Sequence, residues 1–221
     1  MNGKGRYMDK VQIDIVSDVV CPWCIIGYKR LALALIALSD HLEADIHWHP
    51  FELNPAMPTQ GQNLSDHLIE KFGTSAEACL SAKHTLSALG HQVGFQFHYS
   101  EDTKIYNTRK AHQLLMWSQV EDRQLDLVME IFRAYFTQGQ DISSDKVLMD
   151  CAEHAGLNMD TAAKVLNDDS WATAVASTEQ QWIEAGICAV PAIIINKKHI
   201  FSGAQPTEVL INKIDQLAQS S

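Results

Sequence analysis

The stretch DVVCPWCIIGYKR, residues 18–30, contains Cys21 and Cys24 between a run that alternates like a strand and a run that repeats like a helix. Such a pair can be a metal clasp, a structural pair of buried thiols or a reactive dithiol. Residues 11–16, VQIDIV, alternate apolar and polar and predict a strand. Pro22 suits the first turn of a helix, where its missing N–H removes no hydrogen bond. The pair is therefore predicted to open a helix that follows a strand.

The residues after the cysteines predict a strand–helix–strand unit. Apolar residues form a helical stripe, with more apolar residues beside it, which indicates a mostly buried helix; the stripe consists of Tyr28, Leu31, Leu35 and Leu38. Residues 43–51, EADIHWHPF, contain a second strand. Because a helix connects the two strands over a short distance, we expect them to run parallel.

The remaining chain divides by its pattern. The Pro-, Gly- and Asn-rich residues 53–63 predict a linker or loop. Helical patterns then dominate up to about Gly186, and we expect helices over 64–72, 75–89, 106–119, 122–137, 144–155, 159–167 and 169–185. Residues 190–201 predict two strands joined by a turn at Asn196 to Lys198, and a last helix follows in 205–218.

This order, β-α-β, a helical block and β-β-α, is the plan of a thioredoxin fold whose first helix begins with Cys-x-x-Cys. We therefore expect an α/β protein, a thioredoxin fold with a large all-helical insertion domain. The thioredoxin-like domain is predicted to comprise residues 8–62 and 186–221, and the inserted domain residues 63–185. A Cys-x-x-Cys near a βαβ unit is typical of a redox site in a cytosolic protein.

Composition limits the function classes. The chain has 221 residues, 46% of them hydrophobic, which is enough for a full core. Its net charge is −10 and no Lys/Arg run exceeds two residues, so we expect no nucleic-acid partner. The apolar run Leu31–Leu38 is too short to span a membrane, and the first residues have no signal-peptide pattern. We expect a cytoplasmic monomer or homodimer that does not bind membranes.

The chemistry of the pair follows from its position. There are five cysteines, an odd number, which argues against a disulfide framework. Cys21 at a helix N-terminus would be favoured as a thiolate by unpaired N–H groups and the helix dipole. Cys24, one turn on, could then attack a mixed disulfide formed by Cys21. Pro22 stiffens the turn, and Trp23 offers a partner an apolar surface.

Two other interpretations of the pair remain open. Zinc usually takes four ligands, and the sequence has no second Cys-x-x-Cys, although His47 and His49 of HWH could supply two nitrogens. A purely structural pair of buried thiols is the second. Both are weaker than the redox interpretation, and we expect no metal.

Several further motifs appear in order along nearly the whole chain: CPWC at 21–24 with Gly27 after it, HPFELNP at 49–55, YNTRKAH at 106–112, AYFTQGQDIS at 134–143, and AVPAIIIN with FSGAQ at 189–205. With these motifs the chain resembles the DsbA-like thioredoxin family with an inserted helical domain. It is most similar to the cytoplasmic FrnE-type subgroup.

The resemblance implies thiol–disulfide oxidoreductase or isomerase activity on peptide or small-thiol substrates. It implies that Cys21 is the nucleophile, that Cys24 is the resolving thiol and that Pro191 is a cis-proline. The Val190–Pro191 turn is then expected to hold the substrate strand.

Further substrate-binding candidates come from the same motifs and from the region near the cysteines. Asn54 and Asn107 lie in stretches that could approach the active site, and His112 could line the cleft or equally serve in the core or as a helix cap. Asp14 or Asp18 could tune the thiols as a nearby carboxylate. Cys188, three residues before the proline, is expected to be a small buried side chain.

Related families keep two alternatives open. 2-Hydroxychromene-2-carboxylate isomerases and kappa-class glutathione transferases share the expected fold and insertion, but typically have Ser at the first Cys position and use glutathione. We expect no required cofactor here, with glutathione possible as reductant or co-substrate. The alternatives are a glutathione-dependent isomerase or transferase, and a thiol-bearing chaperone without turnover.

Overall fold

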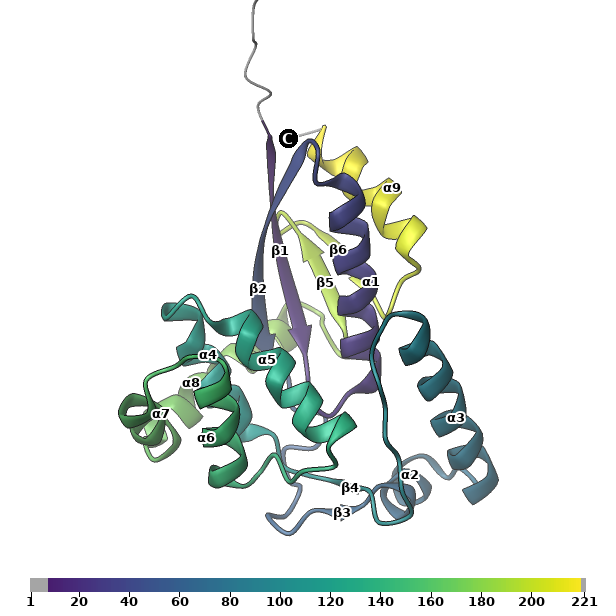
Figure 1. Ribbon diagram of the computed structural model, residues 1–221, viewed down its shortest axis with the longest axis vertical. Helices are drawn as coiled ribbons and strands as arrows, with labels where there is room; N and C mark the ends of the chain where they lie inside the picture. The colour runs from purple at the N-terminus through teal and green to yellow at the C-terminus, as the bar shows by residue number, and fades with distance from the viewer. Residues whose placement is uncertain (1–7, 220–221) are drawn as a thin grey trace, which may run out of the picture.

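The computed structural model describes residues 8–219. Its α/β core is a four-stranded mixed sheet in the order β2-β1-β5-β6 (Figure 1). The strands are β1 (Asp9–Ser17), β2 (Leu42–Pro50), β5 (Ala192–Ile195) and β6 (His199–Ser202). β1 pairs parallel with β2 and antiparallel with β5, which pairs antiparallel with β6. The predicted parallel pair and the C-terminal hairpin are both confirmed.

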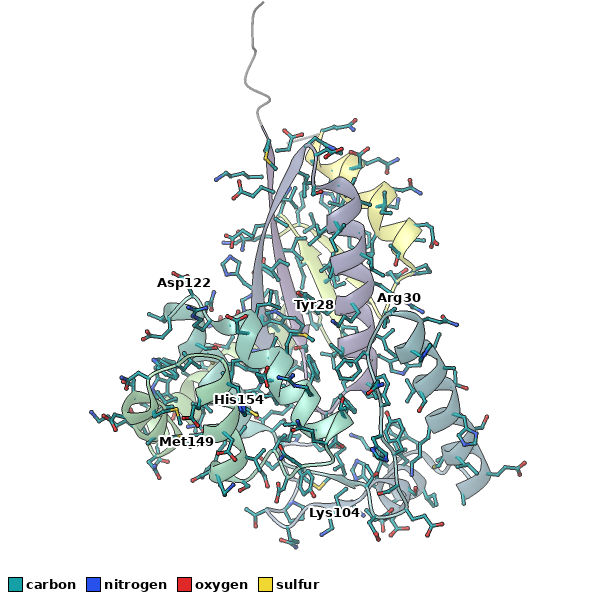
Figure 2. The ribbon with its side chains drawn as sticks, viewed as in Figure 1. Tyr28, Arg30, Lys104, Asp122, Met149 and His154 are labelled. Carbon is teal, nitrogen blue, oxygen red and sulfur yellow. The ribbon has the colours of Figure 1, made fainter. Side chains whose placement is uncertain are left out.

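Helix α1 (Pro22–Leu38) and helix α9 (Thr207–Ala218) pack side by side along the sheet (Figure 1). Gly27 allows a close approach at the start of α1, because a Cβ there would lie 3.3 Å from Cγ of Pro191 and 3.4 Å from Cα of Ala204. One turn on, Arg30, labelled in Figure 2, donates a 2.7 Å hydrogen bond to the Ala204 carbonyl. These contacts fix the start of α1 against the segments that flank the C-terminal hairpin.

Between β2 and β5 the chain is mostly helical. Its helices are α2 (Leu64–Phe72), α3 (Ala76–Gln92), α4 (Arg109–Val120), α5 (Gln124–Phe132), α6 (Asp145–His154), α7 (Met159–Leu166) and α8 (Asp169–Glu184). In Figure 1, α4 to α8 gather around the lower end of β2, and α2 and α3 lie apart from them below α1. The carboxyl end of β1 and the start of α1 therefore face helices from two directions.

Three details of this segment differ from the sequence prediction. Strands β3 (Gln62–Asn63) and β4 (Lys104–Ile105) form a short antiparallel ladder that the pattern did not indicate. The helix expected from residue 106 begins only at Arg109, because the Asn107 side chain accepts a 3.0 Å hydrogen bond from the Arg109 N–H and so forms a turn. The helix expected over 122–137 ends at Phe132 and continues as a π-helical turn, Arg133–Thr137.

Other helix and turn boundaries agree with local sequence features such as capping residues and glycines. Ser75 caps α3 by accepting a hydrogen bond from the Ala78 N–H. Gly156 follows α6 with φ of 74°, in the left-handed region that glycine adopts without strain. Asn196 and Lys197 also have positive φ, 51° and 56°, and form the predicted turn between β5 and β6.

The hydrophobic core runs without a break from the sheet into the helical segment. Trp48 of β2 lies between both parts, with ring centroids 5.1 Å from Tyr28 of α1 and 6.1 Å from Phe132 of α5 (Tyr28 is labelled in Figure 2). The same cluster includes Ile13 and Leu114. The end of the sheet that carries the cysteines is thus fixed by packing from both parts.

Candidate active site

The two cysteines lie at the carboxyl end of β1, where α1 begins. Cys21 is the N-cap of α1, with φ of −88° and ψ of 111°, and its carbonyl accepts a 3.0 Å hydrogen bond from the Cys24 N–H. Both thiols are free and buried. The Sγ of Cys21 lies 3.8 Å from the Val190 carbonyl oxygen, and the Val190–Pro191 peptide bond is cis.

The two sulfurs have different electrostatic surroundings. Burial raises the pKa of the Cys24 thiol well above its usual range, and the hydrogen bond with Cys21 and the charge of Cys21 raise it further. At neutral pH Cys24 therefore holds its proton. Cys21 lies at the first turn of α1, the end of the helix where backbone N–H groups have no intrahelical partner. This pairing suits attack by Cys21 first and by Cys24 second.

A buried carboxylate lies beside the pair. Asp18 is fully buried, and its charge contributes to the raised pKa of Cys24. Its Oδ2 accepts a 2.7 Å hydrogen bond from the Leu53 N–H, and its Oδ1 lies 3.5 Å from Nε2 of His112. Asp14 is also buried, but it pairs with His49 at 2.8 Å and its pKa is lowered chiefly by that contact, against burial. Of these two carboxylates, Asp18 is therefore the one whose charge acts on Cys24.

The polar contacts continue behind Asp18. Burial raises the pKa of Glu52, while its hydrogen bond with Arg109 and the charges of Arg109 and His112 lower it. Nε of Arg109 lies 2.5 Å from Oε1 of Glu52, whose side chain is fully buried while that of Arg109 is 33% exposed. We call these four residues, Asp18, His112, Glu52 and Arg109, the buried polar chain. It runs from the resolving cysteine to a partly exposed cation.

A different environment lies in front of Cys21. A cavity of about 340 Å³ extends from Cys21 toward α2 and α3, and we call it the apolar pocket. Its walls are largely hydrophobic and include Val20, Leu53, Leu68, Phe72, Leu86 and Phe136. Tyr99 also lines it, and burial and the charge of Cys21 raise the pKa of this phenol, which places it near the sulfur. The pocket offers an apolar site next to the nucleophile.

The predicted site residues fall into groups. Cys21, Pro22, Trp23 and Asn54 line the apolar pocket, and the Trp23 side chain is 42% exposed. Oδ1 of Asn54 accepts hydrogen bonds of 3.0 Å from Nε2 of His67 and 2.7 Å from Nζ of Lys71. Asn54 therefore joins the strand end to α2 at the edge of the pocket.

The other predicted substrate ligands lie outside the pocket. Val190 contacts Cys21 but is not among the lining residues. The Asn107 amide donates to the carbonyls of Pro55 and Met57 at 3.2 Å, which orders that loop. The expectation that His112 lines the cleft is corrected, since it is 2% exposed and faces Asp18 inside the protein.

Several residues near the nucleophile have no clear signal in the sequence. Tyr99 belongs to GFQFHYS, and the alternation of Phe95, Phe97 and Tyr99 was the available signal for one shared face. Cys79 of α3 lines the pocket as a second thiol beside Cys21. Cys188 is exposed rather than buried, so that expectation was wrong.

The described residues contain neither a metal-binding cluster nor a membrane-spanning helix. Within residues 8–219, no group of three or more His, Cys, Asp or Glu side chains is placed to hold a metal ion. The helices in the same range are too short or too polar to cross a membrane.

Comparisons with known proteins agree with this geometry. The family model for the DSBA-like thioredoxin domain matches residues 12–215. The chain therefore belongs to the DsbA-like thioredoxin family, whose members include thiol oxidoreductases and isomerases.

Individual proteins refine the picture. A crystal structure of a probable DsbA oxidoreductase from Streptomyces coelicolor superposes with a TM-score of 0.89 at 27% identity, covering 96% of this chain and 91% of that one. The Bacillus subtilis protein YwbO is 25% identical over 84% of this chain and 86% of its own. The cytosolic disulfide reductase DsbM from Pseudomonas aeruginosa has a TM-score of 0.65 at 14% identity, covers 95% of this chain and all of its own, and shows the fold alone.

Proposed function

We propose that the protein is a thiol–disulfide oxidoreductase in which Cys21 attacks and Cys24 resolves. The observation that carries the proposal is the asymmetry of the pair. Cys21 caps the first helix beside a pocket, whereas Cys24 is fully buried next to Asp18. Neither a metal-binding pair nor a structural pair of thiols requires its two sulfurs to have such different surroundings.

The reaction follows from these positions. The Cys21 thiolate attacks one sulfur of a substrate disulfide; that S–S bond breaks, and the first substrate thiolate leaves and takes a proton from solvent. Cys24 gives its proton to Asp18, and its sulfur attacks Sγ of Cys21. The mixed disulfide then breaks, and the second substrate thiolate leaves and takes up the proton. The substrate gains two electrons and the protein dithiol becomes a disulfide; the reverse sequence oxidises a substrate dithiol.

The direction of this exchange depends on the reduction potentials of the partners. In a reducing compartment a small thiol such as glutathione would return the protein to its dithiol form. Support for such a compartment, the cytoplasm, comes from the five free cysteines, one of which, Cys188, is exposed.

The test is a trapping experiment in the Cys188→Ser background, which removes the exposed thiol. Cys24→Ser should accumulate a mixed disulfide on Cys21 with glutathione disulfide or a disulfide peptide, seen as an added mass, and should lose turnover. Cys21→Ser is the matched control and should trap nothing at position 24.

Two results would overturn the proposal. Cys24→Ser with unchanged glutathione-dependent turnover would indicate an isomerase or transferase that does not cycle a dithiol. Prevention of aggregation that survives loss of both cysteines, with no turnover by the unmodified protein, would indicate a chaperone.

A further inference from the structure

We propose that the apolar pocket selects small disulfides or thiols that combine an apolar body with a carboxylate. This assignment of a substrate class rests on the function proposed above. It is carried by three features of the pocket: its position next to Cys21, its apolar walls and the charge of its edge.

The size and lining of the pocket suit a hydrocarbon chain or one aromatic ring. Its volume of about 340 Å³ lies at the lower end of the range for small-molecule sites. Leu64, Leu68 and Leu86 line the side formed by α2 and α3. Trp23 and Phe72 line it too and are 42% and 68% exposed, so they lie at its opening. A substrate that enters past these rings buries its apolar part while its sulfur stays near Cys21.

Apart from the reactive Cys21, the described residues of the lining include basic groups and no carboxylate. Among the described residues that line the pocket, the titratable nitrogen groups are those of Lys71, Lys83 and His67, and none is Asp or Glu, although the whole chain has a net charge of −10. Nζ of Lys71 donates to the Leu53 carbonyl at 2.9 Å and to Oδ1 of Asn54 at 2.7 Å.

The second ammonium group has a neutral partner as well, since Nζ of Lys83 donates to Oγ of Ser65 at 3.0 Å. Within residues 8–219, neither lysine lies within ion-pair distance of a carboxylate. Two cations with neutral partners beside a largely apolar cavity provide a binding position for the carboxylate of a ligand.

The same features disfavour other substrates. Glutathione and peptide segments carry several amide groups, and each amide buried without a hydrogen-bond partner opposes binding. A neutral apolar disulfide would contact the apolar walls of the pocket but would form no ion pair with the lysines. The ligand class that suits both the apolar walls of the pocket and the lysines at its edge is an apolar molecule with a carboxylate.

In the proposed reaction the Cys21 thiolate attacks one sulfur of the bound disulfide and breaks its S–S bond. Cys24 then loses its proton to Asp18, bonds to Cys21, and releases the second substrate sulfur, which takes up a proton. One protein dithiol is oxidised for each substrate disulfide reduced. A single turnover therefore needs only the reduced protein and the substrate.

The experiment follows single turnovers of the reduced full chain by Trp fluorescence, with three disulfides as probes: lipoate, lipoamide and 2-hydroxyethyl disulfide. Lipoate and lipoamide share their ring and chain and differ only in the carboxylate, so their ratio isolates the effect of charge. We expect lipoate to react about fivefold faster than lipoamide at limiting concentration. Lys83→Met should reduce this ratio toward one.

Pocket filling provides the second arm. Ala82 is an exposed α3 residue that lines the pocket, and Ala88 is an exposed α3 residue that does not. Ala82→Trp should slow both lipoate and lipoamide about tenfold and slow the smaller 2-hydroxyethyl disulfide much less, as a steric block of the pocket predicts. Ala88→Trp is the matched control and should change none of the three rates.

The contradicting outcomes are distinct. Equal rates for lipoate and lipoamide overturn the selection for a carboxylate. An Ala82→Trp variant that reacts with lipoate as fast as the unmodified protein overturns the substrate class. The substrate class is also overturned if glutathione disulfide reacts faster than lipoate and Ala82→Trp slows that reaction. In each case oxidation of Cys21 and Cys24 by 2-hydroxyethyl disulfide leaves the proposed function intact. If no disulfide oxidises the pair, the function itself fails.

Discussion

The two sides of the cysteine pair differ sharply. In front of Cys21 lies a largely apolar cavity with two lysines at its edge, open past an exposed Trp23. Behind Cys24 lies the buried polar chain, which begins with a fully buried carboxylate. The front has an apolar cavity, and the back has buried charged and polar side chains.

This difference shows how the helical segment serves the chemistry. Helices α2 and α3 form one wall of the apolar pocket, whereas α4 supplies His112 and Arg109 of the buried polar chain. The thioredoxin-like part supplies the cysteines, and the helices between β2 and β5 contribute to the surroundings of each of them. Changes behind the pair should therefore alter stability and proton transfer, and changes in front should alter substrate preference.

The largest expected effect is a loss of stability from a change in the buried polar chain behind Cys24. Arg109→Met leaves the buried Glu52 carboxylate without its cation and should lower the free energy of unfolding by about 3 kcal/mol at pH 7, measured by urea denaturation. Lys110→Met is the matched control; it breaks an exposed ion pair with Asp145 and should cost less than about 1 kcal/mol.

The pH dependence of this loss has a definite sign. Burial already raises the pKa of Glu52 above its ordinary 4.5, and removing Arg109 raises it further. A carboxyl whose folded pKa is raised favours the folded state below its unfolded pKa, and that contribution is lost as pH rises through the folded value. The difference between Arg109→Met and the unmodified protein should therefore be small below about pH 4.5 and grow toward neutral pH. A difference independent of pH would contradict the role of Glu52.

The next effect tests proton transfer. Asp18→Asn should slow the attack of Cys24 on a mixed disulfide by about 100-fold at pH 7, because the buried thiol loses its proton acceptor. The rate should then rise steeply with pH, since solvent must take the proton from a thiol whose pKa is raised. Quenched-flow mass spectrometry measures this step. Asp14→Asn removes a buried carboxylate elsewhere and should leave the step unchanged; an equal slowing by both variants would show only a structural effect.

A third effect tests how the front and back are held together. Gly27→Val places atoms where a Cβ already lies 3.3 Å from Pro191, and should cost about 2 kcal/mol of stability through overpacking. Ala37→Val on the exposed side of α1 is the control and should change stability by less than about 0.5 kcal/mol. Equal stabilities of the two variants, measured by urea denaturation, would contradict the close contact.

The smallest expected effect is on the reaction rate, from a change at the opening of the apolar pocket. Trp23→Ala should slow the reaction with lipoate about threefold, since an exposed side chain at the opening contributes only part of its surface. Stability and the pH profile of the resolving step should not change. A changed pH profile of the resolving step, measured by quenched-flow mass spectrometry, would mean that front and back are not independent.

Local pattern was sufficient to predict the elements that frame the site. Alternation in 11–16, Pro22 and the turn at Asn196 each depend on neighbours in sequence, and the structure has a strand, a helix start and a hairpin turn there. Asp18 was one of two candidates, and nothing local distinguishes it from Asp14. The distinction depends on Leu53 and His112, which are distant in sequence.

The pocket was beyond prediction for the same reason. Tyr99 and Lys83 lie far from Cys21 in the chain, and only the packing of α3 below α1 brings them to one cavity. His112 was predicted for the cleft because its motif resembles a site motif, but its register on α4 turns it into the core. A motif indicates the neighbourhood of a residue, and packing decides the direction of its side chain.

The most direct test of the central claim is a redox titration of the Cys188→Ser full chain, quenched in acid, denatured, alkylated and mapped by mass spectrometry. We predict that Cys21 and Cys24 lose alkylation together in one two-electron transition and appear joined in a single peptide. Cys79 and Cys151 should stay alkylated throughout, because the proposed reaction uses neither of these buried thiols. If Cys21 and Cys24 stay reduced at every potential, or if either pairs with another cysteine, the dithiol mechanism is contradicted.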